Sequence, residues 1–465
     1  MLPNPVLYSV PLISLDRYII LRDSNMTGPG DNVNGVNSVD YSTLKVASNG
    51  NSNESSVHKS GTETRFYPKE IAHDLDGIPS LSENFIHEAL ATSWEYARCV
   101  IPSYTNWDRY VAFMRTVTIG IIAEVDSTLV DVVSDDFRCG GYTLDEILDT
   151  LFAGTPAEEA GIARDYRTFL ATTAEKTGDR YARILLFHRY VSSLPESPRS
   201  WFRIRDADAL IRFTAASALV CNDILSPSAW FTPAQWEIIG ELACTLYDAV
   251  AFYKHRAEGE VNNTFAYAPW ELRKEAFRMA REVLWGLDTV WGVPGKENGR
   301  VEVVNFIRLI GGPIHLMMRR YRFVEEGLMV GKEEDEEVVR QTKKHVKLWN
   351  RVEIQLTEEG GNEITENDLG NGIENGKARY MHVIGNKDRL LFDGLAELLE
   401  LQVPDRVRCS DCNYRSSYGS EGLGQFGGVQ LCRECKEGWR VWIESLPRRA
   451  AEAFPELRET RLTID

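Results

Sequence analysis

Apolar residues recur every three or four positions from residue 66 to about residue 331, and this spacing limits the fold more than any other feature. Such spacing places apolar side chains on one face of an α-helix, and that face has to be buried against neighbouring helices. The sequence contains neither a glycine-rich nucleotide-binding motif nor a convincing run of alternating strand residues. We therefore predict an all-α core. The clearest helices are expected over residues 84–99, 107–133, 144–152, 181–192, 206–225 and 233–262.

Composition divides the 465 residues into five predicted parts. The first is predicted to be disordered, because residues 24–63 are rich in Asn, Ser and Gly. A stretch rich in Gly, Asn and acidic residues follows the core and predicts a flexible loop. The parts are a disordered segment 1–65, a helical core 66–357, a loop 358–376, a closing segment 377–402 with a helix over 388–401, and a C-terminal module 403–465.

Bulk properties exclude several classes of protein. The net charge of −17 argues against general binding to nucleic acid or to anionic membranes. The longest apolar runs are far too short to span a bilayer, and the N-terminal stretch lacks the features of a secretory signal. Four cysteines lie in apolar or helical surroundings, and we expect them to be reduced core thiols of a cytoplasmic protein. These are Cys99, Cys139, Cys221 and Cys244.

The other four cysteines form a CxxC-x19-CxxC pattern near the C-terminus: Cys409, Cys412, Cys432 and Cys435. Two such pairs supply four thiolates for tetrahedral coordination, which is the usual arrangement of a structural zinc site. The Gly-rich segment between the pairs fits the hairpin of a zinc ribbon. Two disulfides are the alternative, and a reducing compartment disfavours them. Since all four positions are cysteine, we predict structural rather than catalytic zinc.

Segment 247–263 carries its polar residues on one side of a predicted helix. At about 100° per residue, they share an arc of roughly 120°. The residues of this arc are Asp248, Lys254, His255, Glu258 and Asn262. The opposite arc, which we expect to be core, holds Leu246, Val250, Tyr253, Ala257 and Val261. The polar arc suits a site for divalent cations and a polyanion. A solvated surface is the alternative, and the segment alone does not decide between them.

A carboxylate cluster lies on the helix predicted over 107–133. Glu124, Thr128, Asp131 and Asp135 fall within about 60° of one another, whereas Asp126 points roughly 160° away. Carboxylates on one face repel one another unless cations or solvent screen them. Mg²⁺ prefers one or two carboxylates together with water and phosphate oxygens. The alternative is a solvated helix end, which suits Glu124 least because this residue directly follows an apolar run.

Two further clusters contain arginine. On the helix predicted over 205–223, Arg205, Arg212 and Asp223 recur at nearly the same angle, with Asp208 nearby. Either they form an architectural network, or Arg205 binds an anion through two parallel hydrogen bonds. The other cluster lies at 303–327, where a Gly-Gly-Pro sequence at 311–313 is expected to break the helix. Beyond this break, the side chains at 319–322 offer guanidinium and phenol donors for a phosphate.

Helical carboxylate clusters, a downstream Asp/Asn/Lys helix and a later Arg-Tyr pair resemble the arrangement in class I terpene synthases. Four positions agree with the second metal-binding motif of the bacterial members: Asp248, Lys254, Gly259 and Asn263. Three expected ligands are replaced, by Tyr247, Ala251 and His255. The DDxxD sequence of the first metal-binding helix is absent as well. The resemblance to ordinary terpene synthases is therefore partial.

Five longer segments resemble the fungal α-ionylideneethane synthase family, the unconventional sesquiterpene cyclases of abscisic-acid biosynthesis and their trichobrasilenol synthase-like relatives. The segments are WEYARCVIPSYTNWDRYVAFMR, IGIIAEVDSTLVDVV, LYDAVAFYKHRAEGEVNNTFAY, GGPIHLMMRRYRFVEEGL and FGGVQLCRECKEGWR. The resemblance runs from about residue 66 to residue 457. It implies a class I terpenoid-synthase-like helical bundle with a small zinc ribbon. It also implies Mg²⁺-dependent cyclisation of farnesyl diphosphate to an α-ionylideneethane-like hydrocarbon or a related sesquiterpene or alcohol.

The resemblance implies roles for individual residues. The Mg²⁺ ligands would be Glu124, Asp131 and Asp248, with Glu258 and Asp223 as further candidates. The diphosphate would be bound by Arg205, Lys254, Arg320 and Tyr321. His255 and Arg256 are the catalytic candidates, and His255 would either donate a hydrogen bond to phosphate or accept a proton late in the reaction. Aromatic faces would stabilise the carbocation by about 0.5–2 kcal/mol each. The candidates are Phe113, Phe252, Trp270, Trp285 and Phe306.

Two other functions stay open at this point. A prenyltransferase that joins a prenyl diphosphate to a second acceptor would be silent with farnesyl diphosphate alone. A non-enzymatic helical zinc-ribbon protein would need a basic recognition surface, and the sequence has none. We expect a small-molecule substrate and no nucleic-acid or membrane partner. The sequence leaves the product skeleton and the oligomeric state open.

Overall fold

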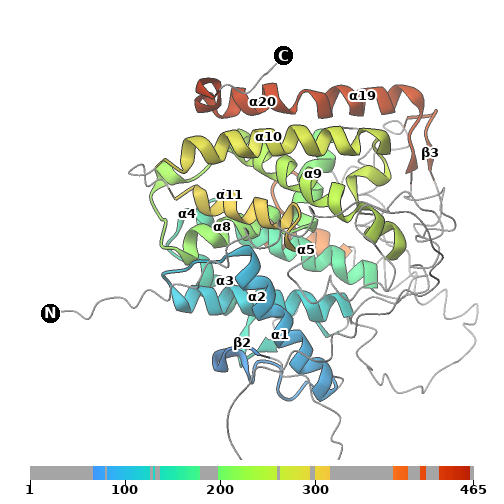
Figure 1. Cartoon of the computed structure of the whole chain (residues 1–465). Coiled ribbons are helices and arrows are strands. Elements are labelled where there is room, and N and C mark those ends of the chain that lie inside the picture. The colour runs from blue at the N-terminus through green and yellow to red at the C-terminus, as the bar shows by residue number, and fades with distance from the viewer. Residues whose placement is uncertain are drawn as a thin grey trace, which may run out of the picture. The chain divides into compact units, whose positions relative to one another are not determined.

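The computed structural model describes residues 66–78, 81–125, 129–130, 137–177, 197–258, 262–293, 299–314, 381–395, 409–414 and 429–460. All of these residues belong to one compact unit, Glu63–Asp465. Over the described ranges the chain is mostly helical, as Figure 1 shows, which confirms the prediction of an all-α fold. The predicted disordered segment 1–65, the predicted helix 181–192 and the predicted loop 358–376 all lie outside these ranges.

The helices and strands follow one another in simple order. The α-helices are α1 (Glu83–Val100), α2 (Trp107–Val125), α3 (Leu144–Phe152), α4 (Pro156–Glu159), α5 (Ile162–Thr177), α7 (Pro198–Asp208), α8 (Ile211–Cys221), α9 (Pro233–Glu258), α10 (Arg273–Trp291), α11 (Val301–Ile310), α17 (Lys387–Leu390), α19 (Arg433–Glu444) and α20 (Leu446–Ala453). Short 3₁₀ helices include η6 (Thr264–Ala266). Two antiparallel hairpins pair β1 (Arg138–Cys139) with β2 (Tyr142–Thr143), and β3 (Asn413–Tyr414) with β4 (Val429–Gln430).

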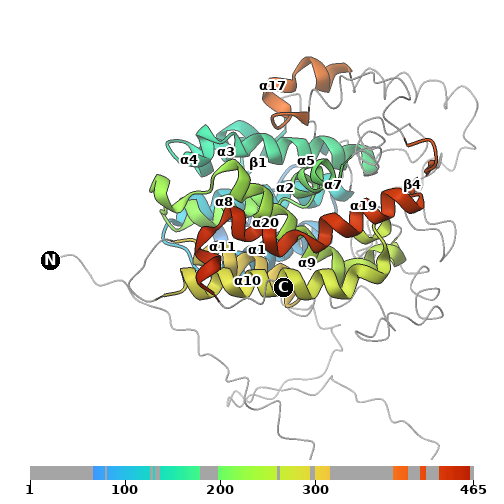
Figure 2. The ribbon, with the colours of Figure 1, turned by 90° about the horizontal axis from the view of Figure 1, so that it is seen from above.

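Helix α9 is the longest helix of the described ranges and lies inside the bundle. It packs against α7, α8, α10, α11 and α20. The C-terminal helices α19 and α20 run along the bundle beside α9 and α10, as the two views in Figures 1 and 2 show. Within the described ranges, no helix combines the length and the apolar character that crossing a membrane requires.

Several helix boundaries agree with the sequence pattern because local chemistry sets them. Helix α3 has the predicted bounds, and a capping box starts it: Glu146 N–H donates to the Thr143 hydroxyl, and Glu146 accepts from the Thr143 N–H. Helix α11 ends at Ile310, followed by a turn at the Gly-Gly-Pro sequence, as predicted. Helix α2 begins at Trp107, but it ends at Val125, and residues 129–130 are not α-helical. The angle calculated from Glu124 to Asp131 along one helix is therefore wrong.

The single helix predicted over 205–223 is also wrong, because the chain forms two helices. Leu210 adopts a left-handed conformation with φ of 54° between α7 and α8. The Asp206 carboxylate accepts a hydrogen bond of 2.7 Å from the backbone N–H of Arg212, near the start of α8. An Asp side chain that satisfies a backbone N–H in this way competes with the helical hydrogen bond and starts a new helix.

The helix predicted over 388–401 is wrong in its described part. Helix α17 ends at Leu390, and Gly394 has a left-handed φ of 88°. Leu390, Leu391 and Phe392 are all buried, and the Phe392 N–H donates to the Thr168 hydroxyl on α5. Three consecutive buried residues fit a short anchoring segment between other elements better than a helix with one apolar face.

Close packing of α7 on α9 depends on Gly240. A Cβ at this position would lie 2.9 Å from the Asp206 Oδ2 atom, and Asp206 is fully buried. We expect Gly240→Ala to lower the free energy of unfolding by about 1–3 kcal/mol, since overpacking forces buried groups to move. Urea unfolding would measure this.

Gly438→Ala on the exposed side of α19 is the matched control, since nothing lies within 4 Å of a Cβ there. It should stabilise the protein by up to about 1 kcal/mol through helix propensity. Equal effects of the two substitutions would contradict the packing argument.

Candidate functional site

Two residues of the polar face of α9, Asp248 and His255, point into the bundle. Asp248 and His255 are 0% and 2% exposed, so the solvated-surface alternative is wrong for both residues. Leu246 is buried as predicted, but Val250 is 37% exposed, and its assignment to the core is wrong. Because α9 is packed by helices on several sides, both of its faces meet protein.

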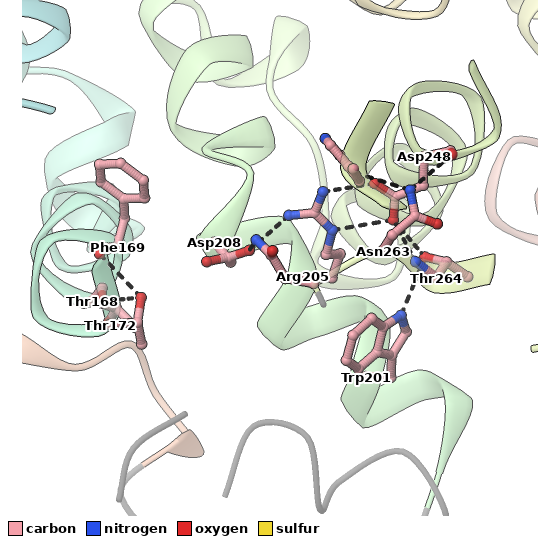
Figure 3. Close-up of polar contacts among 11 residues, drawn as sticks. Thr168, Phe169, Thr172, Trp201, Arg205, Asp208, Asp248, Asn263 and Thr264 are labelled. Atoms are coloured by element: carbon pink, nitrogen blue, oxygen red, sulfur yellow. Dashed lines mark hydrogen bonds and ion pairs between the residues drawn. The ribbon is translucent and has the colours of Figure 1, made fainter. Parts of the chain in front are cut away.

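Asp248 accepts hydrogen bonds from two different segments (Figure 3). Arg205 on α7 binds it with two parallel hydrogen bonds, of 3.1 Å from Nε and 2.6 Å from Nη2. Thr264 at the start of η6 donates its backbone N–H and its hydroxyl to Asp248 Oδ2, at 2.8 and 2.7 Å. Both carboxylate oxygens therefore accept from protein donors, three at Oδ2 and one at Oδ1.

Arg205 is also bound by a second carboxylate. Its Nη1 donates to Asp208 Oδ2 at 2.7 Å, and the Asn262 amide donates to the same oxygen at 2.6 Å. The Arg205 residue is only 2% exposed. Two carboxylates and the planar fork of its donors hold this guanidinium in one orientation inside the bundle. The helical arithmetic grouped Arg205 with Arg212 and Asp223 and placed Asp208 nearby. The structure confirms Asp208 as a partner of Arg205, and the second partner is Asp248 rather than Arg212 or Asp223.

The geometry around Asn263 sets the tautomer of His255. Asn263 is fully buried, its Oδ1 accepts from the Phe265 N–H at 2.9 Å, and its Nδ2 donates to the Asp248 carbonyl at 2.9 Å. These backbone partners assign the amide orientation. Nδ2 lies 3.0 Å from His255 Nδ1, which must then accept the hydrogen bond. A neutral His255 consequently carries its proton on Nε2.

Sequence reasoning missed two members of this network. Trp201 on α7 is fully buried, and its indole N–H donates to the Thr264 hydroxyl at 3.2 Å. The Thr264 hydroxyl in turn donates to Asp248 (Figure 3). A Trp in the first turns of α7 and a Thr after Asn263 have no spacing that indicates such a role, so no sequence signal pointed to them.

Other predicted residues lie apart from this network or outside the described ranges. Glu124 is partly buried near the end of α2. Asp223 accepts from the Thr105 hydroxyl and the Asn106 amide between α1 and α2, and it shares no described partner with Asp248. Asp131, Arg320 and Tyr321 lie outside the described residues. The same holds for the side chains of Lys254, Arg256, Glu258 and Trp270.

The described aromatic candidates differ in their surroundings. Phe113, Phe252 and Phe306 are buried, at 1%, 5% and 1% exposure. Phe113 stacks on Phe213 of α8 with ring centroids 6.3 Å apart, as in an ordinary core. Trp285 is 67% exposed on α10, so we leave it out of the cavity residues proposed below.

A separate cleft of about 330 Å³ lies on the other face of α7. Arg203, Arg212 and Arg449 line it, and each is paired with a buried carboxylate, respectively Asp165, Asp206 and Glu241. Burial raises the pKa of Asp206 and of Glu241 above the ordinary carboxyl value, although the paired arginines oppose this. The cleft does not include Arg205, Asp248 or His255.

The four C-terminal cysteines form a cluster with the geometry of a metal site. Their sulfur atoms all lie within 4.8 Å of one another, and the Cys409 and Cys432 sulfurs are 3.8 Å apart. A tetrahedral zinc site with Zn–S bonds of about 2.3 Å has S···S separations of about 3.8 Å. None of the eight cysteines forms a disulfide bond, so the disulfide alternative is wrong.

Backbone donors support negative charge on these sulfurs. The N–H of Cys435, in the first turn of α19, donates to the Cys432 sulfur at 3.4 Å and lowers the pKa of that thiol. The Cys432 N–H donates to the Cys412 sulfur at 3.2 Å, yet burial raises the pKa of Cys412. Four thiolates this close repel one another unless a cation lies between them. The cluster therefore suits a metal such as zinc.

Comparison with known proteins places this helical bundle among enzymes named as synthases. Residues 63–456 match the family described as Alpha-ionylideneethane synthase aba3. The α-ionylideneethane synthase abl3 of Pyricularia oryzae is 48% identical over 437 residues, which cover 84% of this chain and 83% of the relative. The α-ionylideneethane synthase aba3 of Botryotinia fuckeliana is 50% identical over 400 residues, which cover 86% and 85%. The chain belongs to the α-ionylideneethane synthase family, which confirms the resemblance.

The buried ion pair should be essential for stability. We expect Asp248→Asn to lower the free energy of unfolding by about 3–5 kcal/mol, because it leaves the buried Arg205 without a full counter-charge. Urea unfolding would measure this. Glu282→Gln, in an exposed ion pair with Arg278 on α10, is the control, and it should change stability by less than about 1 kcal/mol. An Asp248→Asn variant as stable as wild type would contradict the buried-pair assignment.

Metal content tests the cysteine cluster. The purified protein should carry about one metal ion per chain, and Cys435→Ser should lose most of it, because a tetrahedral site has no spare ligand. Elemental analysis by mass spectrometry would measure the ratio. Cys99→Ala, in the buried face of α1, is the control and should retain the metal. Equal metal content in the two variants would refute the site.

Proposed function

We propose that this chain is a sesquiterpene synthase that ionises farnesyl diphosphate with the help of Mg²⁺ and cyclises the resulting carbocation to an α-ionylideneethane-like sesquiterpene. The names of the family and of its relatives support the reaction type. The observation that carries the proposal is the buried Arg205–Asp248 pair, which Asn263 links to His255. Asp248 and His255 lie on α9, the helix that resembles the second metal-binding motif of terpene synthases.

The role proposed for Arg205 is to provide positive charge for the leaving diphosphate. Asp208 and Asp248 fix its guanidinium from two sides, so its orientation does not have to change when the substrate arrives. Fixed donors of this kind stabilise developing charge more effectively than mobile ones, because the site needs little reorganisation. Lys254, Arg320 and Tyr321 are proposed as further donors to the same oxygens.

His255 suits the role of a donor better than the role of a proton acceptor. The hydrogen bond from Asn263 occupies Nδ1, and the neutral ring carries a proton on Nε2. An Nε2–H group donates to a diphosphate oxygen without a change of tautomer. We therefore propose this role for His255, and we propose that the adjacent Arg256 contributes positive charge.

The magnesium site is proposed on carboxylates rather than on His255, because Mg²⁺ prefers oxygen ligands. Glu124, which is partly buried at the end of α2, offers such a ligand, and Asp131 and Glu258 are proposed beside it. When bound, Mg²⁺ neutralises negative charge on the diphosphate leaving group. For Asp248 we propose the task of holding Arg205, since protein donors engage both of its oxygens. For Asp223 the contacts with Thr105 and Asn106 favour a structural role.

The carbocation needs an apolar cavity that excludes water. Phe252 lies one turn after Asp248 on α9 and is buried, so it is the described aromatic residue best placed to face the reacting chain. We propose Phe252, Phe306 and Trp270 as cavity residues, with Phe113 in support. Each aromatic face that meets the cation would contribute about 0.5–2 kcal/mol.

We propose that the C-terminal module is a zinc ribbon with a structural role. The four sulfur atoms and the short β3–β4 hairpin beside them support this assignment. Since all four positions are thiols, a tetrahedral ion there has no open position for substrate.

Product analysis tests the proposed reaction. Purified protein with Mg²⁺ and farnesyl diphosphate should yield a sesquiterpene in gas chromatography–mass spectrometry, and chelation of Mg²⁺ should abolish the product. A prenyltransferase would be silent with farnesyl diphosphate alone, and a non-enzymatic protein would give no product with any acceptor. A trace no different from boiled protein would refute the cyclase proposal.

Substitution of His255 tests the proposed donor. We expect His255→Phe to lower kcat by about 10²–10³-fold, since loss of one preorganised donor to developing charge has this effect in other enzymes. His382→Phe, at an exposed position of segment 381–385, should keep kcat within about twofold and serves as the control. Steady-state kinetics of diphosphate release would measure both. A His255→Phe variant with wild-type kcat would exclude the donor role.

A further inference from the structure

Helix α19 connects the cysteine cluster to the interior of the bundle. Cys432 caps the N-terminus of this helix, Cys435 lies in its first turn and Trp439 follows one turn later. At about 100° per residue, positions 432, 435 and 439 share one face of the helix. Trp439 is only 1% exposed, so this face is the one that packs against the bundle.

Trp439 packs directly against the helix that carries Arg205. Its ring lies edge-on to Trp201 of α7, with centroids 6.5 Å apart, and 5.8 Å from the ring of Phe202. Trp201 and Trp439 are the two tryptophans with the lowest exposure in the described ranges, at 0% and 1%. Trp201 then donates to Thr264, and Thr264 donates to Asp248 (Figure 3). An unbroken chain of contacts therefore links the cysteine cluster to the Arg205–Asp248 pair.

A second contact fixes the same C-terminal arm, α19–α20, to α9. Arg449 of α20 binds Glu241 of α9 through two hydrogen bonds, of 2.7 and 2.6 Å, and Glu241 is 3% exposed. Glu241 lies two helical turns before Asp248, on the same face of α9. The arm thus contacts α7 and α9, the two helices whose side chains form the buried pair.

We propose that Trp439 is a positioning residue, through which the state of the cysteine cluster controls the orientation of Trp201, Thr264 and Asp248. The metal at the cysteines holds the first turn of α19, the first turn places Trp439, and Trp439 places the Trp201 indole that donates to Thr264. Loss of the metal releases this support and disorders the anion site, which is the diphosphate site proposed around Arg205, without any contact between the metal and the substrate. The functional consequence rests on the proposed function, whereas the coupling between the cluster and Trp201 does not.

The first test is spectroscopic and uses the full-length, metal-loaded protein. The chain contains 11 tryptophans, and 5-fluorotryptophan labelling with single Trp→Phe variants would assign their fluorine resonances. Removal of the cysteine-bound metal by a zinc chelator should shift or broaden the resonances of Trp439 and Trp201. The resonance of Trp285, which is 67% exposed on α10, should stay in place. A Trp201 resonance that does not change after the metal has been lost would overturn the inference.

The second test measures anion affinity with Mg²⁺ and inorganic diphosphate by titration calorimetry. Trp439→Ala should weaken binding by about tenfold, a coupling of ordinary size between two sites. Trp439→Phe, which keeps an aromatic ring at the contact, should restore most of the affinity. Val441→Ala, at a 60% exposed position of α19, is the matched control and should bind as wild type does.

The outcomes separate the inference from the proposed function. If Trp439→Ala binds diphosphate as tightly as Val441→Ala, Trp439 does not position the anion site and the inference falls. If wild type makes no terpene, the proposed function falls, and the Trp201 resonance still decides whether the cluster is coupled to the interior. If Trp439→Ala does not fold, two measurements still test whether Trp439 positions the anion site. These are the Trp201 resonance of wild type after chelation and the diphosphate affinity of Trp439→Phe.

Discussion

The interior of this protein depends on one buried ion pair. Arg205 and Asp248 lie on different helices and are almost inaccessible to solvent, so each would be very unfavourable inside the bundle without the other. Their position also determines their neighbours: Thr264 has to bring its N–H and hydroxyl to Asp248, and Asp208 has to accept from Arg205. The pair thus joins α7, α9 and the start of η6 through hydrogen bonds. Asp208 and Asp248 together fix the orientation of the Arg205 guanidinium inside the bundle.

A polar centre of this kind requires tightly packed apolar surroundings. Gly240 lets α7 approach α9, and the contact between Trp201 and Trp439 closes the other side of the network. The cysteine cluster lies at the beginning of α19, the helix that carries Trp439. The cluster is therefore joined to the core by the largest buried side chain of that helix. The thiols and the helical core are therefore parts of one packed structure, and the family relationship covers both, from residue 63 to residue 456.

Sequence reasoning succeeded for features that the spacing of residues along the chain itself produces. Apolar periodicity predicted α1, α3 and the start of α2, and the CxxC pairs predicted four clustered thiols. It failed where a side chain competes with the backbone, as Asp206 does when it starts α8 and divides the predicted helix 205–223. The angle calculated between Glu124 and Asp131 was wrong because it assumed one helix through both residues, whereas α2 ends at Val125. Helical arithmetic identified the residues that share a face of α9, but it does not say which way that face points.

The sequence by itself determined the helical class of the fold and the four cysteines, because periodicity and spacing follow from the geometry of the covalent chain. The family followed from the resemblance of whole segments to known relatives. Only the tertiary structure decided that Asp248 binds Arg205, 43 positions away, rather than remaining a free carboxylate. It also decided the tautomer of His255, through the orientation of Asn263, and the contact of α19 with Trp201. These choices depend on which helix faces meet in space. A local pattern does not contain that information, because the partner of a buried polar group is selected by the packing of distant segments.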